Sequence, residues 1–277
     1  MATALPRVQA GPREDGFREL GVLRVGTEGR EQVPDKVIAE APVALVYNGV
    51  PFAVMMATPC DLEDFALGFA LAEGIVAGPG EFELVDVLKT ERGISLQGLI
   101  PRERFDALQQ RKRSLSGRSG CGLCGIESLE EAVRPTPEVA NGPNLDRTAI
   151  AGGMRQLAQA QSLNTLTGGA HAAAFVPKNH PAIVREDVGR HNALDKLVGA
   201  LARTSGASPV ASGFLAITSR ASWEMVHKAA HAGIAVIAAI SAPTSLAIEA
   251  ADAAGITLIA FARDESMNIY THAARIA

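Results

Sequence analysis

The segment Ile234-Ala235-Val236-Ile237-Ala238-Ala239-Ile240 predicts the fold class of this chain. All of its residues are apolar, and such a short, continuous run is typical of a strand that is covered on both faces of its sheet. Sequence that can form helices flanks it, at 222–231 and 244–254. Strands that alternate with helices of this length indicate parallel pairing through right-handed crossovers. We therefore expect an α/β fold.

The same alternation runs through the C-terminal half of the chain. We expect further strands at 172–176, 183–186, 214–218 and 256–262, and further helices at 150–160 and 192–201. A stretch rich in Pro, Asn and Gly at 134–144 predicts a linker. The α/β unit is therefore expected to occupy residues 145–277.

A smaller α+β subdomain is predicted for residues 36–116. Asn48-Gly49 separates two apolar runs, which is a strong β-hairpin signal. Asp61 is expected to cap a helix that ends before Gly74. Two short strands with a turn at Gly93 and a polar, helix-forming stretch complete the subdomain. Residues 1–35 are expected to form a polar N-terminal tail.

Residues 117–144 are predicted to form a reactive cysteine loop and linker. Within this range, Gly120-Cys121-Gly122-Leu123-Cys124-Gly125 surrounds two cysteines with glycine, which favours an exposed, easily approached backbone. The nearby cations Arg111, Lys112, Arg113 and Arg118 would favour thiolate over thiol. The prediction is an accessible, nucleophilic sulfur in a CxxC loop.

Two other interpretations of the cysteine pair remain open from spacing alone. Paired cysteines occur in zinc sites, but Cys60 is the only other cysteine, so a four-thiolate site is impossible and a mixed site would need histidine. A thioredoxin-like redox pair should start a helix, which Gly122 and Gly125 disfavour. Cys60 itself is interpreted as a small buried hydrophobe.

Composition excludes several classes of protein. The 277 residues are 47% apolar and carry a net charge of -4, without the basic footprint of a nucleic-acid-binding protein. No apolar run reaches the length of a membrane span, and the N-terminus has no secretory apolar region. Three cysteines suit a reducing compartment better than a disulfide framework. A soluble, cytoplasmic protein is expected.

Polar segments follow three of the predicted strands, at 219–222, 241–244 and 263–266. Ligands of such sheets gather at the carboxyl ends of the strands. Ser222 and Thr244 could simply be N-caps, but with Arg220 and Arg263 they also suit phosphates. Because no P-loop or Gly-x-Gly-x-x-Gly pattern is present, a large anionic ligand is predicted rather than ATP or NAD.

A further cluster lies at residues 185–196. Asp187, His191 and Asp195 recur at intervals of four, which would place them on one helical stripe if the helix began early. They could form an acid–base device, or buried salt bridges that fix the start of a helix. His171 could aid proton transfer or be a core histidine.

Several of these segments together resemble the FdhD family of formate dehydrogenase accessory sulfurtransferases. The resemblance rests on the cysteine loop 120–125, the segments 42–49 and 55–74, Glu186-Asp187-Val188-Gly189-Arg190-His191, Ser219-Arg220-Ala221-Ser222 and the segment 261–270. It covers nearly everything from about Val37 to the C-terminus.

The resemblance implies a specific function and fold. A cysteine desulfurase would deliver sulfur to Cys121 as a persulfide, with Cys124 assisting, and the sulfur would pass to the Mo-bis(molybdopterin guanine dinucleotide) cofactor before it enters formate dehydrogenase. The implied cofactor-binding residues are Phe261, Ala262, Arg263, Asp264, Glu265 and Ser266. The family also implies a homodimer, a cytidine-deaminase-like three-layer α/β domain, and guanine nucleotides as occupants of the site. Separately from the resemblance, no structural metal is predicted.

Three points qualify this resemblance. Asp264 and Glu265 place acids where an anion is expected, so we expect them to accept hydrogen bonds from guanine N–H groups. Zinc deaminases need a His-x-Glu motif and a Pro-Cys-x-x-Cys motif. No histidine here is followed by Glu at the second position, and Gly120 instead of Pro precedes Cys121, so this activity is not expected. A cofactor-binding chaperone without sulfur transfer remains the alternative.

Overall fold

The computed structural model describes residues 16–27, 29–115, 134–139, 142–178, 180–204 and 212–277, and of residues 111–115 the backbone only. Within them the chain forms a mixed α/β fold with three separate sheets of two, four and six strands. The cysteine loop at 120–125 lies outside the described residues, as do residues 1–15.

The six-stranded sheet has the strand order β12-β11-β10-β9-β7-β8. Its members are β7 (His171–Pro177), β8 (Ile183–Asp187), β9 (Gly213–Ile217), β10 (Val236–Ala239), β11 (Thr257–Arg263) and β12 (Ser266–Ile269). The expected parallel pairing is confirmed for β9, β10 and β11. The pairs β7–β8 and β11–β12 are antiparallel, as expected for strands joined by short connections, and β7 is also antiparallel to β9.

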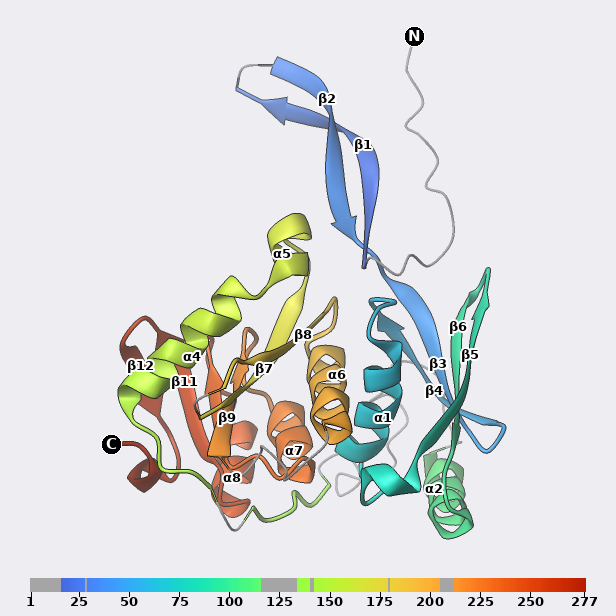
Figure 1. Cartoon of the computed structure of the whole chain (residues 1–277), viewed down its shortest axis with the longest axis vertical. Helices are drawn as coiled ribbons and strands as arrows, with labels where there is room; N and C mark the ends of the chain where they lie inside the picture. The colour runs from blue at the N-terminus through green and yellow to red at the C-terminus, as the bar shows by residue number, and fades with distance from the viewer. Residues whose placement is uncertain (1–15, 28, 116–133, 140–141, 179, 205–211) are drawn as a thin grey trace.

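Helices cover both faces of this sheet, so the unit has three layers (Figure 1). On one face α6 (Arg190–Arg203), α7 (Trp223–His231) and α8 (Ser245–Ala253) enclose one apolar core. On the other, α4 (Arg147–Gln159) packs through Ile150, Met154 and Leu157, and α5 (Ser162–Thr167) follows it. The continuous apolar sequence of the central strand follows from this arrangement, because β10 is buried along its whole length.

The N-terminal unit is built on a four-stranded sheet with the order β4-β3-β6-β5. Its strands are β3 (Ala41–Tyr47), β4 (Val50–Ala57), β5 (Glu83–Thr90) and β6 (Gly93–Leu99), and α1 (Leu62–Ala72) packs on one face. A 3₁₀ turn, η1 (Pro79–Glu81), precedes β5, and α2 (Arg102–Leu115) follows β6. The predicted hairpin at Asn48-Gly49 and turn at Gly93 are both confirmed.

The expected cap of α1 is wrong in its chemistry. Asp61 does occupy the N-cap position, but with φ of 50° and no hydrogen bond from its side chain to the helix. Its carboxylate lies 3.7 Å from Arg185 instead. A tertiary ion pair has replaced the local cap.

The N-terminal segment also differs from expectation, since residues 17–35 are not a tail. β1 (Phe17–Gly26) and β2 (Gly29–Ile38) form an antiparallel hairpin that projects from the body of the protein (Figure 1). Apolar residues are spread among charged ones here, so the sequence pattern indicated a polar segment without regular structure. Pairing across the ladder brings them together, as where Val22 faces Val33.

The two larger units meet where α1 crosses α6. A Cβ atom at Gly68 would lie 1.7 Å from the carbonyl oxygen of Asp195, and one at Gly199 would lie 1.9 Å from that of Asp64. The helix backbones therefore touch, which only glycine allows at these two positions. None of the helices in the described part of the chain combines the length and the apolar character that crossing a membrane would demand.

Candidate functional site

The three predicted polar segments lie together at one edge of the six-stranded sheet. They follow β9, β10 and β11, which are parallel neighbours, so their carboxyl ends share that edge. The backbone links them: Ala221 N donates to Ala242 O at 3.2 Å, and Phe261 N donates to Ser241 O at 3.2 Å. We call the segments 219–222, 241–244 and 261–266 the polar edge.

The segment 261–266 contains an irregular backbone. A β-bulge lies between Ala260 and Arg263, and within it Phe261 has φ of 52°. A positive φ is unfavourable for an aromatic residue, and such strain often accompanies binding sites. The bulge leaves Phe261 41% exposed as a residue, while Ala262 is buried. An exposed aromatic ring held in this way can stack on a planar ring of a ligand.

The remaining residues of this segment are exposed and carry charge or a hydroxyl group. Asp264 has φ of 53° in the turn to β12, beside Glu265 and Ser266. Arg263 donates from Nε to Ile240 O at 3.2 Å, which holds its side chain toward the adjoining segment of the polar edge. The acids offer acceptors and the arginine offers donors. Both kinds of group are available to a nucleotide.

The two candidate N-caps at the polar edge behave differently. Thr244 caps α8 by accepting a hydrogen bond from Ala247 N at 3.3 Å. Ser222 occupies the N-cap of α7 but makes no side-chain cap. Only Thr244 is therefore explained by helix capping.

The acidic residues of the 185–196 cluster form buried salt bridges. Asp187 lies 2.7 Å from Lys196 Nζ, and both side chains are fully buried. Asp187 also accepts hydrogen bonds from Thr58 N and Gly189 N, at 2.9 and 2.8 Å. The interpretation as salt bridges that fix the start of a helix is therefore confirmed. The helix does not begin early enough to place all three residues on one stripe, because α6 begins at Arg190, after Asp187.

Asp195 belongs to a second buried network, at the junction of α1, α6 and α7. Lys228 Nζ donates to both oxygens of Asp195, at 2.8 and 3.0 Å, and to Glu73 at 2.8 Å. Burial alone would raise the pKa of Glu73, but Lys228 and Arg134 hold it well below its usual value. For Asp195, burial outweighs Lys228 and raises the pKa to about 7. This network was not apparent in the sequence, where Glu73 and Lys228 resemble ordinary charges on helix surfaces.

Arg134 shows where the cysteine segment rejoins the described structure. Its guanidinium Nη2 lies 2.7 Å from Glu73 Oε2, at the end of α1. Cys121, Cys124 and Arg118 lie outside the described residues, as do the side chains of Arg111, Lys112 and Arg113. The predicted activation of the thiols by these cations therefore stays a prediction.

Both candidate histidines near the polar edge are partly buried. Burial, followed by the charge of Arg190, lowers the pKa of His191 to about 4, and the same two causes lower the pKa of His171. Both imidazoles are therefore neutral at neutral pH. A neutral imidazole can donate or accept a hydrogen bond, so a role in proton transfer stays a prediction.

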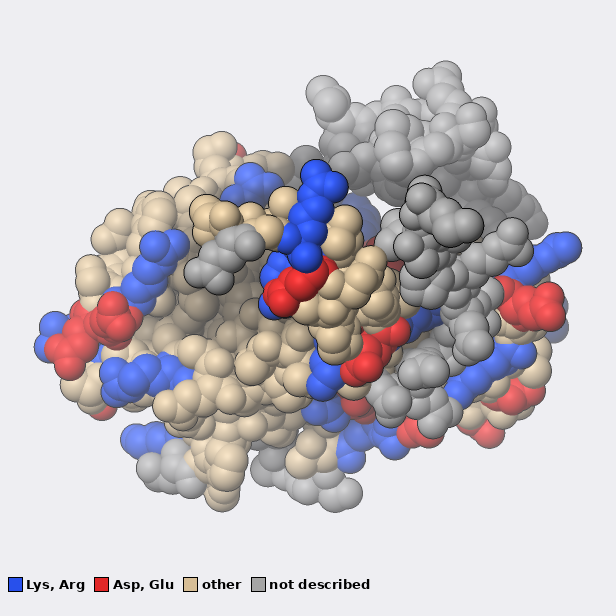
Figure 2. All heavy atoms as spheres, turned by 90° about the horizontal axis from the view of Figure 1, so that it is seen from above, with Lys and Arg blue, Asp and Glu red and all other residues tan. Residues whose placement is uncertain are grey.

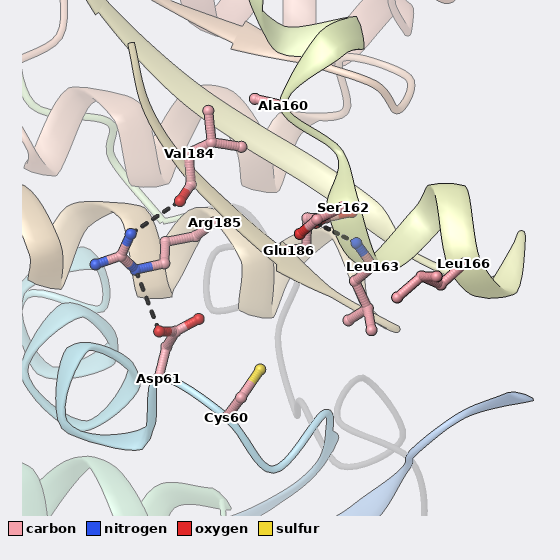
Figure 3. Close-up of a pocket in the computed structure, with 9 residues that line it drawn as sticks. All are labelled: Cys60, Asp61, Ala160, Ser162, Leu163, Leu166, Val184, Arg185 and Glu186. Atoms are coloured by element: carbon pink, nitrogen blue, oxygen red, sulfur yellow. Dashed lines mark hydrogen bonds and ion pairs between the residues drawn. The ribbon is translucent and has the colours of Figure 1, made fainter. Parts of the chain in front are cut away.

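Cys60 lies on a small cavity of about 230 Å³ between α5, β8 and the loop before α1 (Figure 3). Burial raises the pKa of its thiol, although Lys196 Nζ lies only 3.8 Å from the sulfur. The charged groups around the cavity are already paired: Glu186 accepts from Leu163 N and Asn164 N, and Arg185 binds Asp61 and Asp64. This cavity is therefore a poor candidate for sulfur chemistry.

Metal ligation has no support in the described part of the chain. No group of three or more His, Cys, Asp or Glu side chains there is arranged to hold a metal ion. On the face seen in Figure 2, basic and acidic side chains are interspersed where the surface is described. Neither observation points to a metal centre or to a nucleic-acid surface.

Residues 38–277 match the model of the FdhD/NarQ family. The chain belongs to the FdhD/NarQ family. The matched range starts near the end of β2, so most of the projecting hairpin precedes it.

Relatives within the family agree with this assignment. The chain is 54% identical over 245 residues to sulfur carrier protein FdhD of Xanthomonas campestris pv. campestris strain B100, covering 88% of this chain and 86% of the relative. Sulfur carrier protein FdhD of Variovorax paradoxus strain S110 is 52% identical over 243 residues, covering 87% of each chain. These relatives support a general role in carrying sulfur.

A solved structure confirms the fold of this FdhD/NarQ member. The crystal structure of a candidate formate dehydrogenase accessory protein from Desulfotalea psychrophila superimposes with a TM-score of 0.70, at 23% identity. The superposition covers 94% of this chain and 99% of the other. The mixed α/β architecture is therefore shared with that protein.

Proposed function

We propose that this FdhD/NarQ protein is a sulfurtransferase that takes sulfane sulfur from a cysteine desulfurase onto Cys121 and delivers it to a molybdenum cofactor. The observation that carries the proposal is the identity above 50%, over some nine-tenths of the chain, with proteins named sulfur carrier protein FdhD. The acceptor is Mo-bis(molybdopterin guanine dinucleotide), before its insertion into formate dehydrogenase. A chaperone that binds this cofactor without transferring sulfur is the competing function.

The two cysteines divide the chemistry between them. The thiolate of Cys121 attacks the outer sulfur of the desulfurase persulfide, so the S–S bond there breaks and a persulfide forms on Cys121. Cys124 then attacks the inner sulfur, which yields a Cys121–Cys124 disulfide and releases hydrosulfide. The outer sulfur gains two electrons and the thiol pair loses two. Hydrosulfide and one proton replace an oxygen ligand of the cofactor metal, which leaves as water, and two equivalents of a cellular thiol reduce the disulfide and are themselves oxidised to a disulfide.

Phe261, Ala262, Arg263, Asp264, Glu265 and Ser266 are proposed to bind the guanine nucleotide end of the cofactor. Phe261 is exposed on a bulge and can stack on guanine. Arg263 can donate to phosphate, while Asp264 and Glu265 can accept from guanine N–H groups. In this arrangement the acids contact the base and not the phosphate, so their negative charge does not oppose binding of an anionic ligand.

We also propose an architecture, an oligomeric state and a cellular location for the protein. The three-layer unit is proposed to be a cytidine-deaminase-like platform for the cofactor, with the CxxC loop reaching it from the linker. The protein is proposed to act in the cytoplasm as a homodimer. In that setting it would meet both the desulfurase and formate dehydrogenase.

Sulfur loading can be tested by mass spectrometry of the intact protein after incubation with a cysteine desulfurase and cysteine. The full chain is expected to gain about 32 Da, one sulfur atom, that a reducing agent removes. Cys121→Ala should lose this gain, whereas the matched control Cys60→Ala should keep it. Equal loading of Cys121→Ala and the full chain would exclude Cys121 as the carrier, and no loading of the full chain would favour the chaperone.

Nucleotide binding is tested separately by calorimetric titration with GDP. Replacing Asp264 and Glu265 together by alanine is expected to weaken binding about tenfold, which is the effect of losing hydrogen bonds to charged acceptors. Glu249→Ala, an exposed acid on α8, is the charge control. GDP affinity that is the same in the double variant and the control would remove these acids from the site.

A further inference from the structure

Helices α6 and α7 begin at neighbouring positions of the six-stranded sheet. β8 and β9 run in the same direction on either side of β7, so the N-caps Gly189 and Ser222 follow strand ends at one edge. His171, the first residue of β7, lies between those ends and pairs with Asp187. Neither N-cap residue caps its helix with a side chain. The two helix starts therefore face the same edge, and at α6 the carboxylate of Asp187, which is paired with Lys196, accepts a hydrogen bond from Gly189 N.

Unpartnered polar atoms are concentrated at these helix starts. Arg190 Nε, His191 Nε2 and Ser222 Oγ are each shielded from solvent and have no hydrogen-bond partner among the described residues. Ser222 as a whole is only 8% exposed. Burying such groups without a partner is costly, so they are normally matched by a ligand or by water. We call His171, Arg190, His191 and Ser222 the α6–α7 corner.

The charges at the corner favour an anion. Arg190 has no ion pair in the part of the chain that the structure describes, and its charge reaches His171 and His191, where it adds to burial in lowering both pKa values. The N-termini of two helices of nine and fourteen residues add partial positive charge, which at α6 is partly offset by Asp187, a carboxylate already paired with Lys196. The neutral imidazoles and the Ser222 hydroxyl add hydrogen-bond donors.

One acid, Glu224, lies in the first turn of α7. Burial raises its pKa, but Ser222, a backbone amide and the nearby His191 and Arg190 bring it below its usual value, so Glu224 is ionised. The Ser222 hydroxyl lies close enough to Glu224 to lower the pKa of this carboxylate by a hydrogen bond, although its geometry falls short of a well-formed one. Glu224 therefore offsets part of the charge of Arg190 without occupying its donors.

The corner is continuous with the polar edge. Thr244 N donates to Ala221 O at 3.0 Å, next to Ser222, and the same loops lead to Phe261. A ligand on the segment 261–266 could therefore extend toward α6 and α7. Because no three ligating side chains are grouped to hold a metal in the described residues, a cation site is not supported.

We propose that the α6–α7 corner binds an oxoanion group, phosphate or pyrophosphate, with Arg190 and His191 as binding residues and Ser222 as a further donor. The group belongs either to a nucleotide-bearing ligand of the polar edge or to a free anion. Binding at the corner needs neither persulfide nor sulfur transfer. It can therefore be tested independently of the proposed function.

The test is calorimetric titration of the full-length protein with inorganic pyrophosphate. The unmodified chain is expected to bind saturably, and Arg190→Gln to bind at least about tenfold more weakly, because a charge-assisted pair of hydrogen bonds is lost. Arg190→Lys should recover only part of the affinity, since lysine lacks the planar fork of donors. Arg155→Gln, which removes an equal charge from an exposed position on α4, should bind as the unmodified chain does.

Further measurements separate the possible outcomes. Thermal melting checks that Arg190→Gln is folded, and His191→Gln provides a second variant that keeps all the charges. A parallel titration with GDP identifies the source of the anion: weaker GDP binding by Arg190→Gln assigns a nucleotide phosphate, and an effect on pyrophosphate alone assigns a free anion. Equal affinities of Arg190→Gln and Arg155→Gln, or no saturable binding by the unmodified chain, would mean that only water occupies the corner. Cys121→Ala should bind pyrophosphate normally, so failed sulfur loading would leave this site standing.

Discussion

At the scale of single residues, the sequence identified several important side chains but not their partners. Asp187 and Asp195 were each considered for buried salt bridges, and both form them. The partner of Asp195 could not be inferred in the same way, because Lys228 lies 33 positions beyond it in the chain. Arg190 and Ser222 gave no sign of being unpartnered, since hydrogen-bond satisfaction depends on the surrounding fold.

The burial of His191 is expected to make the free energy of unfolding depend on pH. Its pKa in the folded protein is about 4, below the value of about 6.5 in an unfolded chain. Between these values the unfolded state binds the proton and the folded state does not, so the contribution of His191 to stability is present above pH 6.5 and is lost as the pH falls toward 4.

We therefore expect acid to destabilise the unmodified protein more than His191→Gln. The difference between their free energies of unfolding should change by on the order of 2 kcal/mol between pH 7 and pH 4.5. Urea denaturation at a series of pH values measures this difference. His180→Gln, at an exposed position, is the control, and parallel pH profiles for His191→Gln and the unmodified chain would contradict the assignment.

At the scale of elements, helices and strands were predicted well wherever local sequence determines them. The Asn48-Gly49 hairpin and the strand–helix alternation from 213 to 263 are both present. The β1–β2 hairpin was missed because charged residues interrupt its apolar pattern. The contact of α1 with α6 was missed because a glycine within a helix carries no information about what approaches it.

Gly199→Ala is expected to destabilise the protein strongly. Its new Cβ atom would lie 1.9 Å from the carbonyl oxygen of Asp64, so one helix backbone must move. Overpacking of this kind costs about 1–3 kcal/mol or more, which exceeds the gain of about 1 kcal/mol in helix propensity. Chemical denaturation measures the change in the free energy of unfolding.

Gly152→Ala is the matched control for this substitution. Gly152 lies in α4, and a Cβ atom added there would have nothing within 4 Å, so alanine should be neutral or stabilising by up to about 1 kcal/mol. If both substitutions stabilise the protein equally, the helices do not cross in backbone contact.

At the scale of the whole molecule, buried polar contacts join the two larger units. Lys196 Nζ donates to Thr58 O at 2.9 Å while it pairs with Asp187, and Asn192 Nδ2 donates to Met56 O at 2.8 Å. Separating the units would remove hydrogen-bond partners from a fully buried ion pair, which costs free energy. The subdomains predicted from the sequence are therefore not expected to be independent.

We expect a single cooperative unfolding transition for the complete chain. Scanning calorimetry should give one peak whose calorimetric and van't Hoff enthalpies agree. Lys196→Met, which leaves Asp187 buried without its counter-ion, should lower the free energy of unfolding by about 3–5 kcal/mol. Two resolved peaks in the unmodified protein would show that the units unfold separately.

The sequence by itself determined the α/β class, most of the helices and strands, and membership of the family through its motifs. These depend on local periodicity, turn residues and short patterns, all of which are written along the chain. Only the tertiary structure decided which polar segments share an edge, which buried charges are paired and which donors are left without a partner. Those properties depend on groups that meet in space after distant segments pack together, and no spacing along the chain specifies them.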